Sequence, residues 1–480
     1  MSGETALTRE ESGPGDRGST LFLVWICAVA SLGGFLFGFD TAVISGTIEF
    51  VESQFLLSKV ALGWFGSSAL FGCILGSALA GWFGDRYGPK PVLITAGVFF
   101  FVSALYSTIP ESFTVLTVAR ALGGLGVGMA SVLAPMYISE FAPARVRGRV
   151  VALYQLSIGI GILSAYFSNY LLLTRAQGII ASGVAGTPLH YFLVDQVWRG
   201  MFGMEMIPAA AFTALLFFVP ESPRWLVKAG RESAALAILS RINGLETGRR
   251  VLAEITTALS HEEGTVRELF RPGLRKALVL GVGLSLFGQL TGVNVVVYYG
   301  PTILQQAGLA SSSAFAYQVA LGTIGLIFTV FAIWKIDTWG RRPLLVGGMV
   351  LVTGSMAATA LLMQLGAPAI WIVLMLGLYM ASLAISICSV IWVMTPEIFP
   401  NRVRGRGSSI ATFTNWTTNA LTAFIFPWYV STLGMHSGFY TFAAICLIAT
   451  IFFWKLTPET RGKSLEEIEK YFTGGQDDQA

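Results

Sequence analysis

The chain has 480 residues, of which 54% are hydrophobic and only 12% charged, and its formal net charge is +4. Soluble domains carry about twice that charged fraction, so the composition excludes a soluble protein of this length and indicates an integral membrane protein. The basic residues lie in short loops between apolar runs and form no single patch, which argues against nucleic-acid binding.

The chain begins with a polar segment rich in Gly, Ser and Glu, and we predict that residues 1–20 form a disordered cytoplasmic tail. Apolar runs long enough to cross the roughly 30 Å hydrocarbon layer follow. In the first half they are 21–46, 60–83, 90–109, 114–137, 150–172 and 199–219. In the second half they are 276–305, 313–335, 343–365, 369–395, 407–432 and 437–456. The sequence therefore predicts an all-α protein with twelve transmembrane helices, in two six-helix bundles at 21–219 and 276–456.

The segments outside these runs set the expected orientation. Residues 220–275 are polar and helix-prone, which favours a cytoplasmic linker of short amphipathic helices, and residues 457–480 form a C-terminal tail. Residues 173–198 are predicted to be a surface loop on the other side. Lys and Arg concentrate in the linker, the tail and the loops on the same side, so both termini are expected to be cytoplasmic in a multi-pass plasma-membrane protein.

Three charged motifs occur twice, about half the chain apart. EFAPARVRGR at 140–149 is repeated as EIFPNRVRGR at 397–406, GDRYGPKP at 84–91 corresponds to IDTWGRRP at 336–343, and PESPR at 220–224 corresponds to PETRG at 458–462. Repetition in this order indicates two homologous halves, as in many membrane transporters.

These motifs place acidic and basic side chains at the inner mouth of each half. Ion pairs there could hold helices together in one conformation and release them in another, which would make a gate; the alternative is that the charges only fix topology. The candidates are Asp85, Arg86, Glu140, Arg147 and Glu221 in the first half, and Asp337, Arg341, Glu397, Arg404 and Glu459 in the second.

Together, GDRYGPK, PESPRWL, GRRP, PETRG and the paired RVRGR segments resemble the sugar porter branch of the major facilitator superfamily. The resemblance covers about residues 21–470. It implies two six-helix halves, a cytoplasmic helical linker and alternating access to one central sugar site. It also implies that the inner-mouth network locks the outward-open state.

Two charges fall inside apolar spans of the first half. Asp40 lies deep in the first span, and we place Arg120 as the only other charge well inside a span of this half. A buried carboxylate must be protonated, paired or in contact with water, so the two residues could couple helix movement to proton uptake and release. The alternative is a static salt bridge. Bacterial proton-linked sugar porters resemble this segment and carry the same Asp and Arg, whereas animal glucose facilitators have Asn at the position of Asp40.

A sugar presents hydroxyls and apolar C–H faces, so its site needs neutral amides and aromatic rings. Candidates within the spans are Gln155, Gln289, Asn294, Tyr298, Trp392, Asn415 and Trp416. Gln289 and Asn294 would diverge on a straight helix, but Thr291 and Gly292 between them favour a local break. The alternative for any single amide is a bond to a neighbouring helix. The resemblance matches all of these positions except Tyr298 to the family's sugar-binding residues.

The sequence departs from the family pattern at four places, one of which is a pair of residues. Gly288 replaces the first Gln of a Gln-Gln pair, Gly325 stands where many relatives have Asn, and Cys388-Ser389 replaces a Gly-Pro. Ile162 occupies a place that is Gln in bacterial xylose permeases and Ile in glucose facilitators. The departures imply a different sugar, weak binding, or water in the vacated space.

From these observations we expect a secondary active transporter that carries a monosaccharide, a hexose or a pentose, together with a proton. Alternatives are a proton-independent facilitator and, from another class, a sugar sensor on a transporter fold. The motifs of ATP-driven transport and of hydrolases are missing from the sequence, so an enzyme is not expected. The expected partners are the sugar, the proton and the lipid bilayer, in a monomer with neither a metal site nor a cofactor.

Overall fold

The computed structural model describes residues 18–143, 147–182, 190–260, 266–400, 403–463, 467–468 and 471–472, and this part of the chain contains helices and no strand. The first half comprises α1 (Thr20–Val43), η1 (Ile44–Gly46), α2 (Ile48–Phe55), α3 (Lys59–Tyr87), α4 (Pro89–Thr108), α5 (Phe113–Phe141), α6 (Arg147–Ser182), η2 (Tyr191–Asp195), α8 (Val197–Gly203) and α9 (Met206–Leu216). Short helices α10 (Pro223–Lys228), α11 (Glu232–Asn243), α12 (Leu245–Ser260) and η3 (Val266–Phe270) follow.

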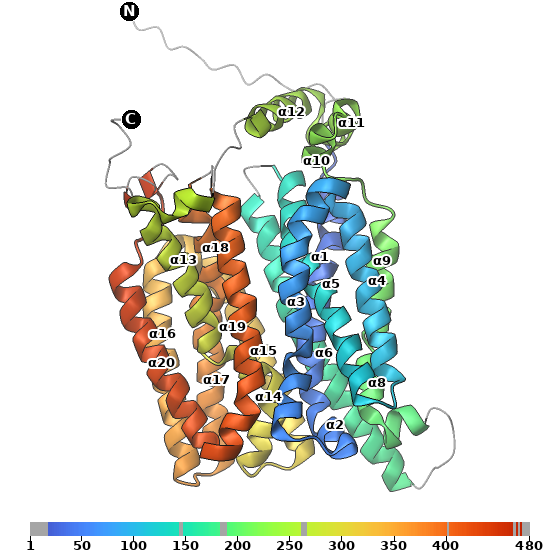
Figure 1. Cartoon of the computed structure of the whole chain (residues 1–480), viewed down its shortest axis with the longest axis vertical. Helices are drawn as coiled ribbons and strands as arrows, with labels where there is room; N and C mark the ends of the chain where they lie inside the picture. The colour runs from blue at the N-terminus through green and yellow to red at the C-terminus, as the bar shows by residue number, and fades with distance from the viewer. Residues whose placement is uncertain are drawn as a thin grey trace, which may run out of the picture.

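The second half comprises α13 (Pro272–Leu290), α14 (Val293–Gln306), α15 (Ser311–Trp339), α16 (Arg341–Gln364), α17 (Ala369–Ile385), α18 (Ile387–Glu397), α19 (Arg404–Leu433) and α20 (Met435–Leu456). The long helices of both halves run side by side, and α10, α11 and α12 lie at one end of the molecule (Figure 1). We call this end the linker end and the opposite end the far end.

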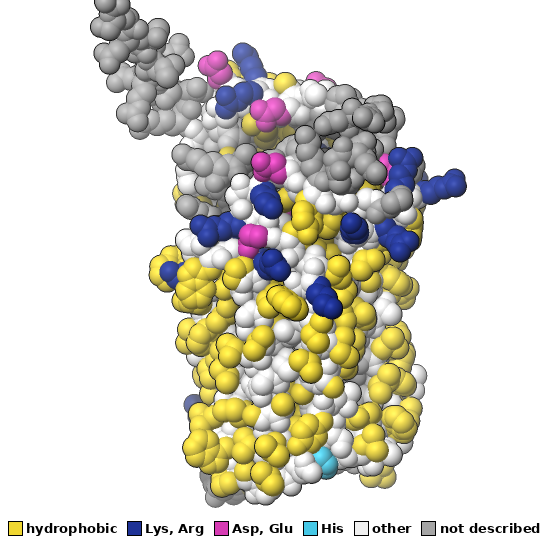
Figure 2. Space-filling view, turned by 90° about the vertical axis from the view of Figure 1, so that its left-hand side faces the viewer, with side chains coloured by type: hydrophobic (Ala, Val, Ile, Leu, Met, Phe, Trp, Pro, Cys, Tyr) yellow, Lys and Arg dark blue, Asp and Glu magenta, His cyan; other side chains and the backbone are white. Residues whose placement is uncertain are grey.

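Ten helical segments of the described chain are long and apolar enough to cross a membrane. The other two expected spans also run along the bundle (Figure 1) but differ in sequence. The middle of α19 is polar, and α8 and α9 are interrupted at Met204 and Glu205, because Pro208 has no N–H to donate to the carbonyl of Met204. Figure 2 shows Lys and Arg side chains gathered toward the linker end, with hydrophobic side chains over most of the remaining face.

The all-α, two-bundle architecture is confirmed, but some boundaries differ from those predicted. The predicted loop 173–198 is wrong in part, because α6 continues to Ser182 and η2 is a π-helical turn. Besides the span interrupted between α8 and α9, two further predicted spans are each divided in two. Gly292, with φ of 84°, separates α13 from α14, and Ser386 separates α17 from α18.

The halves contact each other mainly where α3 packs on α19 and α6 packs on α15. A Cβ on Gly63 of α3 would lie 2.1 Å from the carbonyl oxygen of Phe424 on α19, so only glycine allows this approach. At the far end, Gln305 Nε2 on α14 donates to Glu49 Oε2 on α2 across 2.9 Å. The two halves are thus held together at the end opposite the linker.

Candidate functional site

A cavity of about 190 Å³ lies between the halves. Helices α1 and α6 line it from the first half, and α13, α14, α15, α17, α18 and α19 line it from the second. Its lining includes all seven residues that the sequence predicts for sugar binding: Gln155, Gln289, Asn294, Tyr298, Trp392, Asn415 and Trp416. The structure therefore gathers these amides and aromatic rings from five helices, α6, α13, α14, α18 and α19, around one space.

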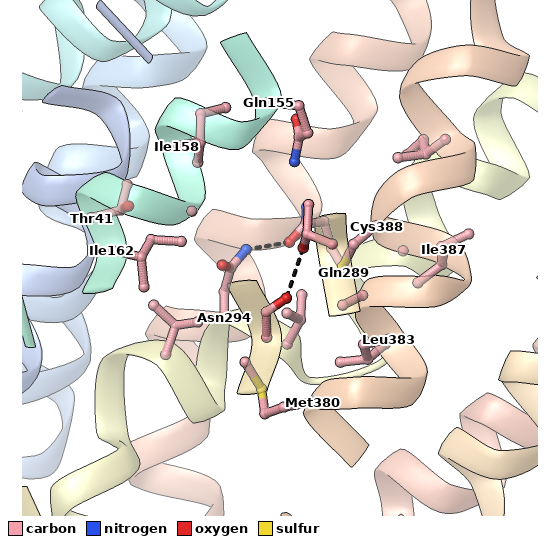
Figure 3. A pocket seen from close by; sticks show the side chains of 18 of the residues that line it. Thr41, Gln155, Ile158, Ile162, Gln289, Asn294, Met380, Leu383, Ile387 and Cys388 are labelled. Carbon is pink, nitrogen blue, oxygen red and sulfur yellow. Dashed lines mark hydrogen bonds between the residues drawn. The ribbon is translucent and has the colours of Figure 1, made fainter. Parts of the chain in front are cut away.

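The break predicted at Thr291 and Gly292 is confirmed, and it brings two of these amides together. Asn294 Nδ2 donates to Gln289 Oε1 across 2.5 Å (Figure 3). Gln289 Nε2 in turn donates to Asn415 Oδ1 across 2.8 Å. The hydroxyl of Tyr379 donates to the Thr291 carbonyl at 2.9 Å and so satisfies a backbone group that the break exposes. The three amides form a chain that presents both donors and acceptors.

The aromatic residues occupy different depths. Trp416 is 1% exposed and packs on Phe37, with ring centroids 5.4 Å apart, whereas Trp392 is 41% exposed. Within the described chain, Trp416 Nε1 has no hydrogen-bond partner although it is buried. Tyr298 accepts a bond of 3.1 Å from Asn419, a lining residue that our sequence analysis missed. Asn419 is one helical turn from Asn415, so the helical period was the available signal.

The four departures from the family pattern also concern this cavity, since Ile162, Gly288, Gly325 and Cys388 all line it. Ser389 faces elsewhere, because its hydroxyl donates to the Ala384 carbonyl at 2.6 Å. The positions that lack amides are therefore part of the site itself.

The predicted pair of buried charges is in contact. Arg120 donates through Nη1 to Asp40 Oδ1 and through Nη2 to the Asp40 carbonyl at 3.0 Å. The two side chains are 2% and 0% exposed, so both ionic groups have left water and stabilise one another. Thr41, the residue after Asp40, lines the cavity, so the ion pair lies directly behind the cavity wall.

The expectation that Arg120 is the only other deeply placed charge in this half is wrong. Glu205, at the interruption between α8 and α9, is 1% exposed and interacts electrostatically with both Asp40 and Arg120. Its position as a single acid inside the apolar run 199–219 was a signal that the sequence analysis overlooked. With both carboxyl groups ionised, this cluster would carry an excess negative charge, which one bound proton would neutralise.

At the linker end of the first half, the repeated motifs meet through hydrogen bonds. Glu221 accepts from the backbone N–H of Lys90 at 3.2 Å, and Ser222 donates to Glu140. Asp85 pairs with Lys228 at 2.9 Å. Arg86 lies 5.6 Å from the ring centroids of Trp82 and Tyr87, and the side chain of Arg147 lies outside the described residues.

The second half repeats this arrangement. Glu459 accepts from the backbone N–H groups of Arg341 and Arg342 at 3.0 and 3.1 Å, and Thr460 donates to Glu397 at 2.7 Å. Arg341 also pairs with Asp337 at 3.0 Å and with Glu397 at 3.1 Å. Arg404 Nε donates to the Phe399 carbonyl at 3.3 Å. Each of these bonds joins elements of one half.

Two bundles of membrane-length helices are related by an internal repeat and enclose a cavity lined by amides, aromatic rings and aliphatic side chains. These features define a secondary transporter. The sequence pattern of the family described as "Sugar (and other) transporter" matches residues 26–472. The chain belongs to this family of transporters, whose members are not enzymes.

Named relatives are similar over nearly their whole length. The arabinose-proton symporter of Bacillus subtilis (strain 168) is 39% identical over 452 residues, which cover 94% of this chain and 95% of the relative. The D-xylose-proton symporter of Escherichia coli (strain K12) is 39% identical over 484 residues, with 93% and 95% covered. A partially occluded, inward-open structure of the E. coli xylose transporter XylE superposes with a TM-score of 0.81 at 34% identity, covering 93% of this chain and 100% of that one.

Proposed function

We propose that the protein is a proton-coupled symporter that carries a monosaccharide across the plasma membrane by alternating access. The observation that carries this proposal is the buried pair of Asp40 and Arg120 directly behind the wall of the central cavity. A passive carrier needs no ionisable group there, and placing one away from water is costly. Relatives named as arabinose- and xylose-proton symporters support the same function.

In this proposal the cluster of Asp40, Arg120 and Glu205 binds the coupling proton, and no resident cofactor takes part. The amides of Gln155, Gln289, Asn294 and Asn415 bind sugar hydroxyls, and the rings of Trp392 and Trp416 pack against the sugar. Protonation removes the excess charge of the cluster and weakens the ion pair between Arg120 and Asp40, so that α1 can shift relative to α5 while the bond from Arg120 to the Asp40 carbonyl is retained.

The closed far end supports an assignment of the conformation. We infer that the linker end is cytoplasmic, because the basic side chains gather there (Figure 2), and that the protein works as a monomer with both termini inside. The bond between Gln305 and Glu49 then closes the outer side, and the cavity is in its inward-facing state. In this state the charged residues of the paired motifs at the linker end form bonds within each half. New bonds between the motifs of the two halves would close the inner side.

The test is uptake of labelled L-arabinose and D-xylose by proteoliposomes that contain the full chain. An acidic outside should drive accumulation above equilibrium, and Asp40→Asn should abolish accumulation but retain sugar exchange. Glu246→Gln, which changes an exposed carboxyl on α12, is the control and should accumulate sugar normally. If the wild type equilibrates the sugar but does not accumulate it, the protein is a facilitator and proton coupling is overturned. If the wild type binds sugar but shows no counterflow, the protein is a sensor and transport is overturned.

A further inference from the structure

The walls of the cavity differ in polarity. Gln289, Asn294 and Asn415 form the amide chain described above. The wall built by α17 and α18 instead presents Met380, Leu383 and Ile387 to the cavity. Figure 3 shows Leu383 and Ile387 on one side of the amides and Met380 below the amides. We call this surface, defined by Met380, Leu383 and Ile387, the apolar wall.

A hydroxyl beside the apolar wall already donates a hydrogen bond, since Thr329 donates to the Gly325 carbonyl at 2.8 Å. A sugar hydroxyl can therefore donate to the Thr329 oxygen, but it can accept from Thr329 only if this bond breaks. The apolar wall itself offers a sugar hydroxyl only hydrocarbon and a thioether. A buried hydroxyl that meets such a surface carries the cost of its lost hydration.

The two glycines of the site do not add polar surface. A Cβ on Gly325 would lie 3.5 Å from Cε of Met380, and a Cβ on Gly288 would lie 3.5 Å from Cγ1 of Ile387. The space beside each glycine is therefore bordered by apolar side chains. It has room for a small apolar group of the ligand, and filling it would bury hydrocarbon against hydrocarbon.

We infer that the site selects a monosaccharide with an apolar edge, and that its best ligands are 6-deoxyhexoses, whose methyl group faces the apolar wall while the ring hydroxyls meet the amides. A pentopyranose fits with a ring methylene at this wall but fills less of the space. An ordinary hexose places its hydroxymethyl group against the hydrocarbon of the apolar wall. This inference rests on the proposed function.

The experiment compares sugars that share ring stereochemistry and differ in one substituent. L-Arabinose, D-fucose and D-galactose carry hydrogen, methyl and hydroxymethyl at the same ring carbon, as do D-xylose, 6-deoxy-D-glucose and D-glucose. Each sugar competes with the labelled sugar in counterflow by wild-type proteoliposomes. In the series that binds, the methyl sugar should bind about tenfold tighter than the hydroxymethyl sugar.

A variant pair ties the preference to the wall. Met380→Gln supplies an amide of similar size and should bring the two affinities close to equal, whereas Met380→Leu should retain the preference for the methyl sugar. Hydroxymethyl sugars that bind as tightly as methyl sugars in both series, with water serving the hydroxyl, would overturn the inference while leaving sugar transport intact. Failure of all six sugars to compete or to be transported would overturn the proposed function as well.

Discussion

Arg120 contacts Asp40 twice, once at the carboxylate and once at the backbone carbonyl, where Nη2 lies 3.0 Å from the oxygen. Protonation of Asp40 therefore weakens only one of the two contacts. The bond to the carbonyl keeps the guanidinium close, so that the ion pair re-forms when the proton leaves. Glu205 adds a second carboxyl to the same buried cluster.

Glu205→Gln tests whether that second carboxyl assists proton binding. The substitution leaves one carboxylate and one guanidinium, whose charges balance, so the cluster binds a proton less tightly. We expect accumulation to require a more acidic outside than in the wild type, while sugar exchange at equal pH is retained. Accumulation measured over a series of outside pH values gives the shift. An unchanged pH profile with only lower thermal stability would assign Glu205 a structural role.

Trp416→Phe tests the buried indole N–H as a sugar contact. The ring remains against Phe37, but the donor is lost, so the affinity for sugar should fall by about 1 kcal/mol, or about fivefold in Kd. Equilibrium binding measured by calorimetry in detergent checks the change. Trp428→Phe, at an exposed position of α19, is the matched control. An unchanged Kd for Trp416→Phe would show that the sugar does not meet this N–H group.

Gly88→Ala and Gly340→Ala test two equivalent positions of the paired motifs at the linker end. Their φ angles are 95° and 91°, and an added Cβ would lie 2.5 Å from Glu221 Oε2 and from Glu459 Oε2 respectively. Each substitution should cost about 1–3 kcal/mol of stability through backbone strain and displacement of the carboxylate. Thermal unfolding in detergent measures the loss. Gly347→Ala, where an added Cβ meets nothing within 4 Å, should unfold at the wild-type temperature or above.

Glu221→Gln tests a pH dependence of stability. Burial raises the pKa of Glu221 above its ordinary value of 4.5, although the N–H groups of Ser222 and Lys90 oppose the shift. An acid whose pKa is higher in the folded state binds protons more tightly there, so its contribution to stability is complete below pH 4.5 and is lost as pH rises through the folded pKa.

The wild type should therefore lose more thermal stability than Glu221→Gln when the pH is raised from 4.5 to neutral. The difference between the two melting temperatures at each pH isolates this residue from the other titrating groups. Glu246→Gln should follow the wild type. Parallel curves for wild type and Glu221→Gln would contradict the predicted linkage.

Much of the architecture could be predicted because hydropathy marks the spans and repeated charged motifs mark the halves. The break near Gly292 was also predictable, since only glycine adopts its backbone angle readily. The bonding partners of the charged residues were harder to predict from the sequence. Asp85 meets Lys228 from the linker, and Glu221 accepts from a backbone N–H that sequence does not identify as a free donor. Such pairs depend on where helix ends meet in space.

Because both halves line one cavity, a bound sugar contacts both halves and holds them together, although they must separate to release it. Every contact that strengthens attachment to both sides at once also slows the parting of the halves. Rapid turnover therefore favours weak binding of the sugar. A compound that binds tightly to both the polar and the apolar sides of the cavity would inhibit the transporter instead of being transported.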